Sequence, residues 1–137
     1  MKKLKLIAGP FTFQGHFEEQ NAPKTVAALV RQMPFQNKII HVRWSGEAVW
    51  VPLGDEDYAV GFENNTSHPA PGHVIFYPGG VSETELLIAY GPVSFACKAG
   101  PLSGNHFATL TDGLENLHPL GRKTLLEGAQ DIRFEIG

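Results

Sequence analysis

This chain of 137 residues has one cysteine, no cluster of basic residues and no long apolar run. Cys97 is the only cysteine, which excludes an intramolecular disulfide and a cluster of thiolate ligands around a metal. The 11 Lys and Arg residues are outnumbered by 14 Asp and Glu, and the net charge is −3 at pH 7. Without a basic face, binding to nucleic acid or to an anionic membrane surface is not expected.

The apolar segment at the start of the chain is short. Leu4 to Ala8 follows Met1-Lys2-Lys3, is interrupted by Lys5 and ends at Gly9-Pro10, which does not match a secretory signal peptide. No apolar run approaches the length of a transmembrane helix. We therefore expect a soluble, cytoplasmic protein that does not bind membranes.

Glycine and proline are plentiful, with 15 and 10 residues, beside a hydrophobic content of 42%. These values are typical of a globular protein with many turns, and the length suits one domain around one core. We predict a single domain over residues 1–137 with no internal repeat.

Short segments in which apolar and polar residues alternate predict antiparallel strands, and Phe11 to Phe17 shows the pattern most clearly. The predicted strands are Leu4–Ala8, Phe11–Phe17, Lys38–Trp44, Glu47–Pro52, a short one near Tyr58–Phe62, Gly72–Tyr77, Glu85–Tyr90, Gly104–Leu110 and Ala129–Ile136.

Two helical segments are expected. The first spans Ala22–Met33, with Asn21 as N-cap and Pro23 in the first turn. The second spans Asp112–Glu127, and its proline and glycine predict a split into two short pieces. Antiparallel strands with one early and one late helix favour a mainly β fold, a closed barrel whose open ends the helices cover.

Three groups of residues resemble cyclophilins. An acidic loop, Ala22-Pro23-Lys24-Thr25-Val26 and a helix are similar to the opening of that family. Phe95–Pro101, followed by Gly104–Phe107, resembles the segment in which Met-Ala-Asn-Ala-Gly-Pro precedes Asn-Gly-Ser-Gln-Phe-Phe. His41-Val42-Arg43 with Gly54-Asp55 downstream resembles the His-Arg that precedes Gln-Gly-Gly-Asp.

The resemblance is closer to small bacterial cyclophilin-like families of unknown function. Arg43–Glu47, which contains their Trp-Gly-Glu type of hairpin, Tyr77–Gly80 and Gly104–Phe107 look like one such family. The resemblance covers nearly the whole chain. It implies a single closed antiparallel cyclophilin-like β-barrel with two helical segments.

The resemblance also implies a groove around Arg43, but the groove residues of an isomerase are only partly matched. Pro52 stands at a Gln position and cannot donate a side-chain hydrogen bond. One alignment places His106 at another Gln and Ala108 at a groove Phe, whereas an alternative register puts Gly104–Leu110 on the strand that enters the second helix. These departures argue against isomerase activity.

The hairpin residues suggest how such a groove could be built. If Ser45-Gly46 is a two-residue turn, His41 lies opposite Trp50, and His41, Arg43 and Trp50 share one face. Arg43 could then stack on the indole and bind an anion or a carbonyl. The alternative is an exposed sheet face on which the arginine packs over the tryptophan and binds nothing.

We expect a protein that binds a small molecule or a short peptide in a groove lined by His41, Arg43, Trp50, Tyr90 and His106. It would be an accessory protein or a weak enzyme of small-molecule metabolism, with no metal and no cofactor. One alternative is a peptidyl-prolyl cis-trans isomerase, in which Arg43 stabilises the twisted amide. Another is a structural or assembly protein without a site, and the sequence leaves a homo-oligomer open.

Other polar residues have less support. Glu47 either reaches solvent at the end of its strand or is a buried general base. Glu83 and Glu85 are either a solvated edge or paired carboxylates that divide acid and base roles. None of the six histidines forms the i, i+4 pair of a zinc helix, so a metal site from His41, His106 and a glutamate remains only an alternative. Cys97 is expected to be a small buried thiol.

Overall fold

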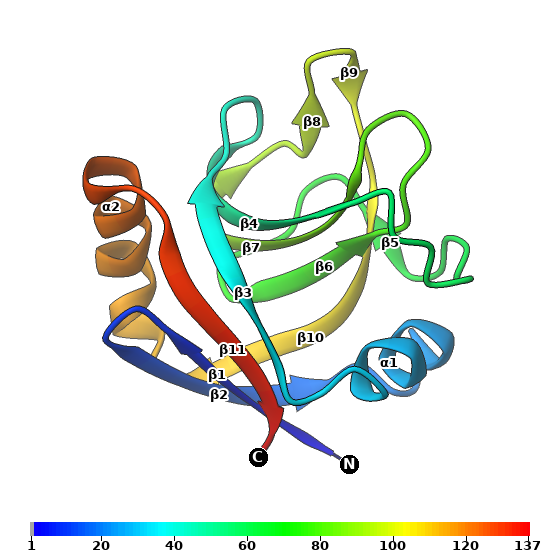
Figure 1. The fold of residues 1–137 in the computed structure, drawn as a ribbon, viewed down its shortest axis with the longest axis horizontal. Coiled ribbons are helices and arrows are strands. Elements are labelled where there is room, and N and C mark those ends of the chain that lie inside the picture. Colours follow the sequence, from blue (N-terminus) through cyan, green and yellow to red (C-terminus); the bar gives the residue numbers. More distant parts are fainter. Residues whose placement is uncertain (1) are drawn as a thin grey trace.

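The computed structural model describes residues 2–137 and has a mainly β architecture with two helical segments (Figure 1). The elements in chain order are β1 (Lys3–Ala8), β2 (Phe11–Phe17), α1 (Pro23–Val30), β3 (Phe35–His41), β4 (Gly46–Gly54), β5 (Asn65–Thr66), β6 (His73–Tyr77), β7 (Thr84–Val93), β8 (Ala96–Cys97), β9 (Gly100–Pro101), β10 (Gly104–Asp112), the 3₁₀ turn η1 (Leu114–Asn116), α2 (Leu117–Glu127) and β11 (Gln130–Ile136).

Eight of these strands form a closed antiparallel barrel in the order β2-β1-β11-β3-β4-β7-β6-β10. The pairing of β2 with β10 closes it, with Ala108 opposite Phe17 and Leu110 opposite Gly15. Gly15 is required at this seam, because a Cβ there would come within 2.1 Å of the carbonyl oxygen of Thr109. Closure removes the free strand edges that an open sheet would expose. The predicted closed barrel is therefore confirmed.

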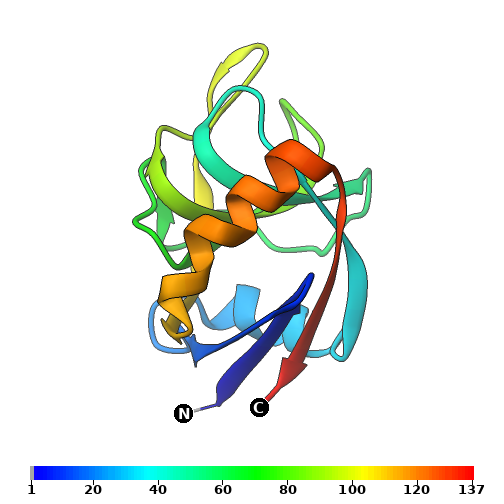
Figure 2. The same ribbon diagram turned by 90° about the vertical axis from the view of Figure 1, so that its left-hand side faces the viewer.

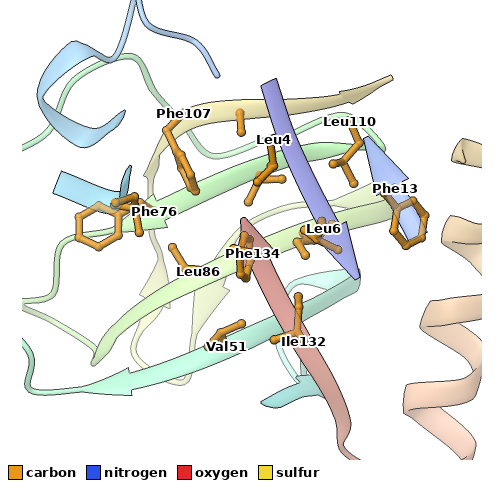
Figure 3. Close-up of a cluster of buried hydrophobic side chains, with 14 of the residues drawn as sticks. Leu4, Leu6, Phe13, Val51, Phe76, Leu86, Phe107, Leu110, Ile132 and Phe134 are labelled. Atoms are coloured by element: carbon orange, nitrogen blue, oxygen red, sulfur yellow. The ribbon is translucent and has the colours of Figure 1, made fainter. Parts of the chain in front are cut away.

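The core fills the interior of the barrel. Every second side chain of the strands points inward, and those of Leu4, Leu6, Phe13, Phe107 and Phe134 are almost fully buried. Figure 3 shows them converging from several strands onto one space. Each such side chain contributes about 1.5–3 kcal/mol through burial, so this cluster is the main source of stability.

The two helices lie on opposite sides of the barrel, as Figures 1 and 2 show from perpendicular directions. The first helix is shorter than predicted, Pro23–Val30 in place of Ala22–Met33. Its N-cap is Ala22 rather than Asn21, and no side chain at the N-cap position bonds the first turn. The chain continues as a loose turn to Met33, whose N–H donates to the carbonyl of Val30 at 3.1 Å.

A carboxylate from a distant loop caps α1 instead. Glu63 accepts hydrogen bonds from the backbone N–H and the hydroxyl of Thr25, at 2.6 and 2.7 Å. Asn105 of β10 donates to the same hydroxyl at 3.1 Å and to the carbonyl of Gly61 at 2.9 Å. This network fixes the helix and the loop before β5 to the barrel wall.

The second helical segment begins at Leu114 rather than at Asp112, and its helix α2 is not split at its proline or glycine as predicted. Pro119 is the third residue of α2, where the missing N–H costs nothing because first-turn donors have no partner within the helix. Gly121 packs on Tyr90, and a Cβ there would come within 2.3 Å of the phenol ring. The glycine therefore lets the helix approach β7 closely. No helix in residues 2–137 is long and apolar enough to cross a membrane.

Two strand predictions need correction. No strand covers Tyr58–Phe62, and the short strand of this loop is β5, seven residues later than the predicted start. β3 spans Phe35–His41 rather than Lys38–Trp44, so the chain leaves the barrel before Arg43. The alternative register for Gly104–Leu110 is right, because β10 leads through η1 directly into α2.

A second, smaller apolar cluster lies on the outside of the barrel wall. Outward-facing side chains of β4, β6 and β7 pack against Phe95 and Leu102, which flank the β8–β9 hairpin. The cluster contains Ala48, Ile75, Tyr77, Leu87, Ala89, Val93, Phe95 and Leu102, with Trp50 and Cys97 at its margin. The hairpin is thereby held against the outside of the sheet, where it forms one wall of the cleft described next.

Candidate functional site

A pocket of about 310 Å³ opens where the loop after β3, the β8–β9 hairpin and the start of β7 come together. Figure 1 shows the β3–β4 loop and this hairpin projecting at the same end of the molecule. Residues from all three segments and from β4 line it: Ile40, His41, Val42, Arg43, Trp44, Ser45, Trp50, Val81, Ser82, Glu85, Ala96, Cys97, Lys98 and Ala99.

The β3–β4 connection differs from the predicted two-residue turn. Ile40 pairs with Trp50 and His41 with Val49, one residue out of the expected register. A slip of one residue exchanges the two faces of a strand. Ile39, not Ile40, is therefore the fully buried core residue of β3, and His41 shares a face with Val49 rather than with Trp50.

Ser45 ties the longer connection to the segment that leads into the β8–β9 hairpin. Its hydroxyl donates to the carbonyl of Ala96 at 3.1 Å and accepts from the N–H of the same residue at 3.0 Å. Its carbonyl accepts the N–H of Ser94 at 2.9 Å. Ser45 is 4% exposed and fastens the loop after β3 to the strand that opens the hairpin. It joins two walls of the pocket and does not act as a turn residue.

The rim of the pocket carries cationic and large apolar side chains. Arg43 and Lys98 are both exposed, and neither makes an ion pair or a side-chain hydrogen bond within residues 2–137. Trp44 is 56% exposed and Val81 is 73% exposed. A rim that combines free positive charge with uncovered apolar surface is suited to a ligand that has both an anionic and an apolar part.

Deeper in the pocket, Trp50 and Glu85 lie on the outer face of the sheet. Trp50 packs against the outer apolar cluster and is half-buried. Glu85 is 6% exposed and pairs through its backbone with Pro52 of β4 and Tyr77 of β6. Its neighbour Glu83 precedes β7 and is exposed. The two carboxylates therefore have very different surroundings, and the predicted solvated edge holds only for Glu83.

Sequence reasoning left Glu85 out of the groove. The available signal was that the rest of β7 is apolar on both faces, because Leu86 and Ile88 face the core while Leu87 and Ala89 face outward. A glutamate at the start of such a strand is a candidate for burial.

His41 borders the pocket but is held from the other side. Its Nδ1 donates to the carbonyl of Val42 at 2.8 Å, so its Nε2 accepts the hydroxyl of Tyr90 at 2.7 Å. Burial, with Glu47 nearby, raises the pKa of Tyr90. Tyr90 belongs to the main core and packs on α2, and it does not line the pocket. It orients the histidine ring rather than facing a ligand.

His106 lies in a different cluster. Its ring stacks on His73 of β6, with centroids 4.0 Å apart. Its Nε2 donates to Thr109 at 2.8 Å, and the Thr109 hydroxyl donates to Glu18 at 2.7 Å. Glu18 also accepts from His16 of β2 at 2.9 Å. None of these residues lines the pocket, and the network joins the three strands at the seam of the barrel.

Burial and neighbouring groups shift the pKa values of Glu18, His73 and His106 in this network. Burial opposes ionisation of Glu18, but Thr109, His106 and His16 more than offset it and lower the pKa of the carboxyl. Burial lowers the pKa of both His73 and His106, and each ring meets the other at stacking distance. The pKa shifts therefore favour the neutral forms of His73 and His106 and the ionised form of Glu18.

Within the described part of the chain, no three His, Cys, Asp or Glu side chains are grouped to hold a metal ion. Glu47 is half-buried and packs on Gly91, where a Cβ would come within 2.0 Å of its Oε1. Cys97 is half-buried at the pocket rather than enclosed in the core. Ala108 is fully buried in the barrel and cannot be a groove residue.

The structure thus brings together His41, Arg43 and Trp50 of the predicted groove, and leaves out Tyr90 and His106. All three line one pocket, but they do not share one sheet face as predicted, because His41 pairs with Val49 and Arg43 lies in the loop after β3. Ligand binding by these residues stays a prediction.

A protein-family model covers nearly the whole chain. The family described as "Protein of unknown function (DUF3830)" has a model that matches residues 5–136. No curated protein sequence matches the chain.

Solved structures with the same fold are distant in sequence. McbB in complex with tryptophan matches with a TM-score of 0.73 at 15% identity, over 96% of this chain and 44% of McbB, so the chain spans less than half of McbB. A hypothetical protein of Archaeoglobus fulgidus matches with a TM-score of 0.62 at 13% identity, over 99% and 95% of the two chains.

A cyclophilin-type peptidyl-prolyl cis-trans isomerase of Cryptosporidium parvum, solved in the presence of the dipeptide Ala-Pro, is also similar. Its TM-score is 0.58 at 14% identity, over 98% of each chain. Likenesses at such low identity establish a cyclophilin-like fold, in agreement with the resemblance found in the sequence.

Proposed function

We propose that the chain, which belongs to the DUF3830 family of proteins of unknown function, binds a small organic anion with an apolar body in the pocket around Arg43. The carrying observation is that Arg43 is an exposed cation without an ion-pair partner in residues 2–137, beside Trp50 in one cleft. An arginine at a cleft with no partner of its own is available to an external carboxylate.

The size of the pocket supports a compact ligand. A volume of about 310 Å³ is at the lower end of the range typical of small-molecule sites. Trp50, Val81 and Trp44 supply apolar surface, and Lys98 adds a second cation at the rim. Two proteins of similar fold are described with small ligands, one with tryptophan and one with the dipeptide Ala-Pro, which is consistent with this size class.

Intrinsic fluorescence gives a direct test. The chain has two tryptophans, Trp44 and Trp50, and both line the pocket. Phenylacetate is a suitable probe because it has one carboxylate and one ring and does not fluoresce in the tryptophan range. We expect it to change the emission saturably, whereas the neutral isostere phenylacetamide should bind at least about tenfold more weakly, as expected for loss of a charge-assisted hydrogen bond.

Two arginine variants identify the anion contact. Arg43→Ala should weaken phenylacetate binding by about tenfold or more, and its melting temperature should stay near that of the wild type because an exposed arginine contributes little to stability. Arg31→Ala, at another exposed arginine, which lies at the end of α1, is the matched control and should bind normally.

Either of two results would count against the proposal. Unchanged affinity in Arg43→Ala would mean that Arg43 does not contact the ligand. No response to phenylacetate up to about 10 mM, where fragment-sized ligands are still detected, would favour the alternative of a structural protein without a site.

A further inference from the structure

Glu85 is the most unusual ionisable group of the pocket. It lies on β7 between two paired strands, with Pro52 on one side and Tyr77 on the other. Its outward-facing neighbours along β7 are Leu87 and Ala89, which belong to the outer apolar cluster. A glutamate residue that is only 6% exposed, in such surroundings, normally has a cationic or hydrogen-bonding partner.

No such partner exists within residues 2–137. The carboxyl of Glu85 takes part in no ion pair and in no side-chain hydrogen bond there. In the same residues, no fully enclosed side-chain oxygen or nitrogen lacks a hydrogen bond. Since Glu85 makes no bond, its oxygens are not fully enclosed. Glu85 lines the pocket, so its oxygens reach solvent there.

The neighbouring charge of Glu83 also opposes ionisation of the Glu85 carboxyl. Burial, and then the nearby carboxylate of Glu83, raise the pKa of Glu85 to about 8. The hydroxyl of Tyr77 is engaged by the N–H groups of Val81 and Ser82, at 3.0 and 3.3 Å. The other ionisable groups that line the pocket are His41, Arg43, Cys97 and Lys98. Without ligand, the carboxyl therefore holds its proton at neutral pH.

We infer that the ligand of this pocket is a zwitterion, an amino-acid-like molecule whose carboxylate meets Arg43 and whose ammonium group pairs with Glu85. The inference rests on the proposed function and deepens it by naming the second charged contact. Formation of this ion pair also requires that Glu85 lose its proton. The ammonium group enters in its charged form, the carboxyl of Glu85 becomes a carboxylate, and its proton leaves to solvent, so that one proton is released for each ligand bound.

Three related probes separate the two poles. L-phenylalanine has both charges, phenethylamine has only the ammonium group, and phenylacetate has only the carboxylate. Titration calorimetry at pH 7 in phosphate and in Tris, whose ionisation enthalpies differ, counts the protons exchanged. We expect the release of about one proton with phenylalanine and phenethylamine, and none with phenylacetate. At roughly pH 9, above the pKa of Glu85, phenethylamine should release almost no proton, because the carboxyl is already ionised and this amine is still mostly charged.

Glu85→Gln is the decisive variant, since it keeps the shape of the side chain but cannot form a carboxylate. It should weaken phenylalanine and phenethylamine by about tenfold or more, abolish proton release and leave phenylacetate within about twofold. The matched control is Glu83→Gln, which removes the exposed neighbouring carboxylate and should still bind both amines.

The outcomes distinguish a failure of this inference from a failure of the proposed function. If phenylacetate binds through Arg43 but the amines bind without proton release, or bind equally well to Glu85→Gln, this inference is wrong and the proposed function stands. The inference is also overturned if phenylacetate binds and neither amine does. If none of the three probes binds, the proposed function itself has failed.

Discussion

At the scale of single residues, Glu85 links the pocket to the stability of the fold. Its pKa rises from an ordinary value of 4.5 to about 8, so the folded protein holds this proton more tightly than the unfolded chain does. The stabilisation of the folded state by this proton is therefore fully present below pH 4.5 and is lost as the pH rises from 4.5 to 8. The protein tolerates a buried carboxyl that costs stability at and above neutral pH.

Glu85→Gln should remove this loss. Relative to wild type, we expect the free energy of unfolding of the variant to increase between pH 4.5 and 8, by about 4–5 kcal/mol in total. Urea unfolding across this range measures the difference. Glu83→Gln, at an exposed position, should show a much smaller trend. Parallel pH profiles for wild type and Glu85→Gln would contradict the buried-acid interpretation.

The pocket residues show what sequence can and cannot provide at this scale. Arg43 and Trp50 could be chosen from their resemblance to a groove, and both line the pocket. The predicted two-residue turn is not present, and the loop that carries Arg43 is instead held by Ser45, which bonds to Ala96, 51 residues away along the chain. No local pattern announces a contact of that kind. Glu85 was missed for the same reason, since its burial depends on strands that pair from both sides.

At the scale of elements, the motifs that carry the resemblance have a structural role. Thr25 lies in the Ala-Pro-Lys-Thr-Val segment and Asn105 in the Gly-Asn-His-Phe segment, and the two side chains bond directly at 3.1 Å. Together with Glu63 they attach α1 to β10. These residues identify the fold because they hold it together, and for that reason they say little about the ligand.

Glu63→Ala tests this account of α1. The substitution leaves the N–H and hydroxyl of Thr25 without their acceptor, which should cost about 1–2 kcal/mol in the free energy of unfolding. It should also speed hydrogen exchange in the first turn of α1. Glu56→Ala, an exposed glutamate of the same loop, should change stability by no more than about 0.5 kcal/mol. If the two variants are equally stable, Glu63 is not the cap of this helix.

For the molecule as a whole, the closed barrel was predictable, whereas the way in which the pocket is built was not. Alternating segments and two helical stretches predict the strands and helices along the chain, and the resemblance to cyclophilins implies the closed barrel, which leaves no edge of its sheet unpaired. The pocket is built on the outside of that barrel, by a hairpin and a loop that contact it only in the folded state. A shared fold therefore does not imply a shared activity.

The outer face of the barrel and the position of Arg43 bear on the alternative of a prolyl isomerase. The resemblance implies a groove on the outer face beside Arg43, with an apolar pocket for proline and a Gln that donates to the peptide. Pro52 occupies that Gln position and has no side-chain donor. Phe95 and Leu102 already cover part of the outer apolar surface of β4, β6 and β7. Arg43 lies in a loop beyond the end of β3, which changes where its guanidinium can reach.

We therefore expect no catalysis of prolyl isomerisation. In a proline tetrapeptide, cis–trans exchange should keep its spontaneous time constant of roughly 10–100 s at 25 °C when the protein is added. Exchange measured by NMR, with an active cyclophilin-type isomerase as positive control, is the appropriate assay. The proposed ligand site makes a further demand, because L-phenylalanine should still shift the emission of the tryptophans in the same sample. Clear acceleration that disappears in Arg43→Ala would reverse this assignment, because it would place a peptide amide, rather than a free carboxylate, against the guanidinium.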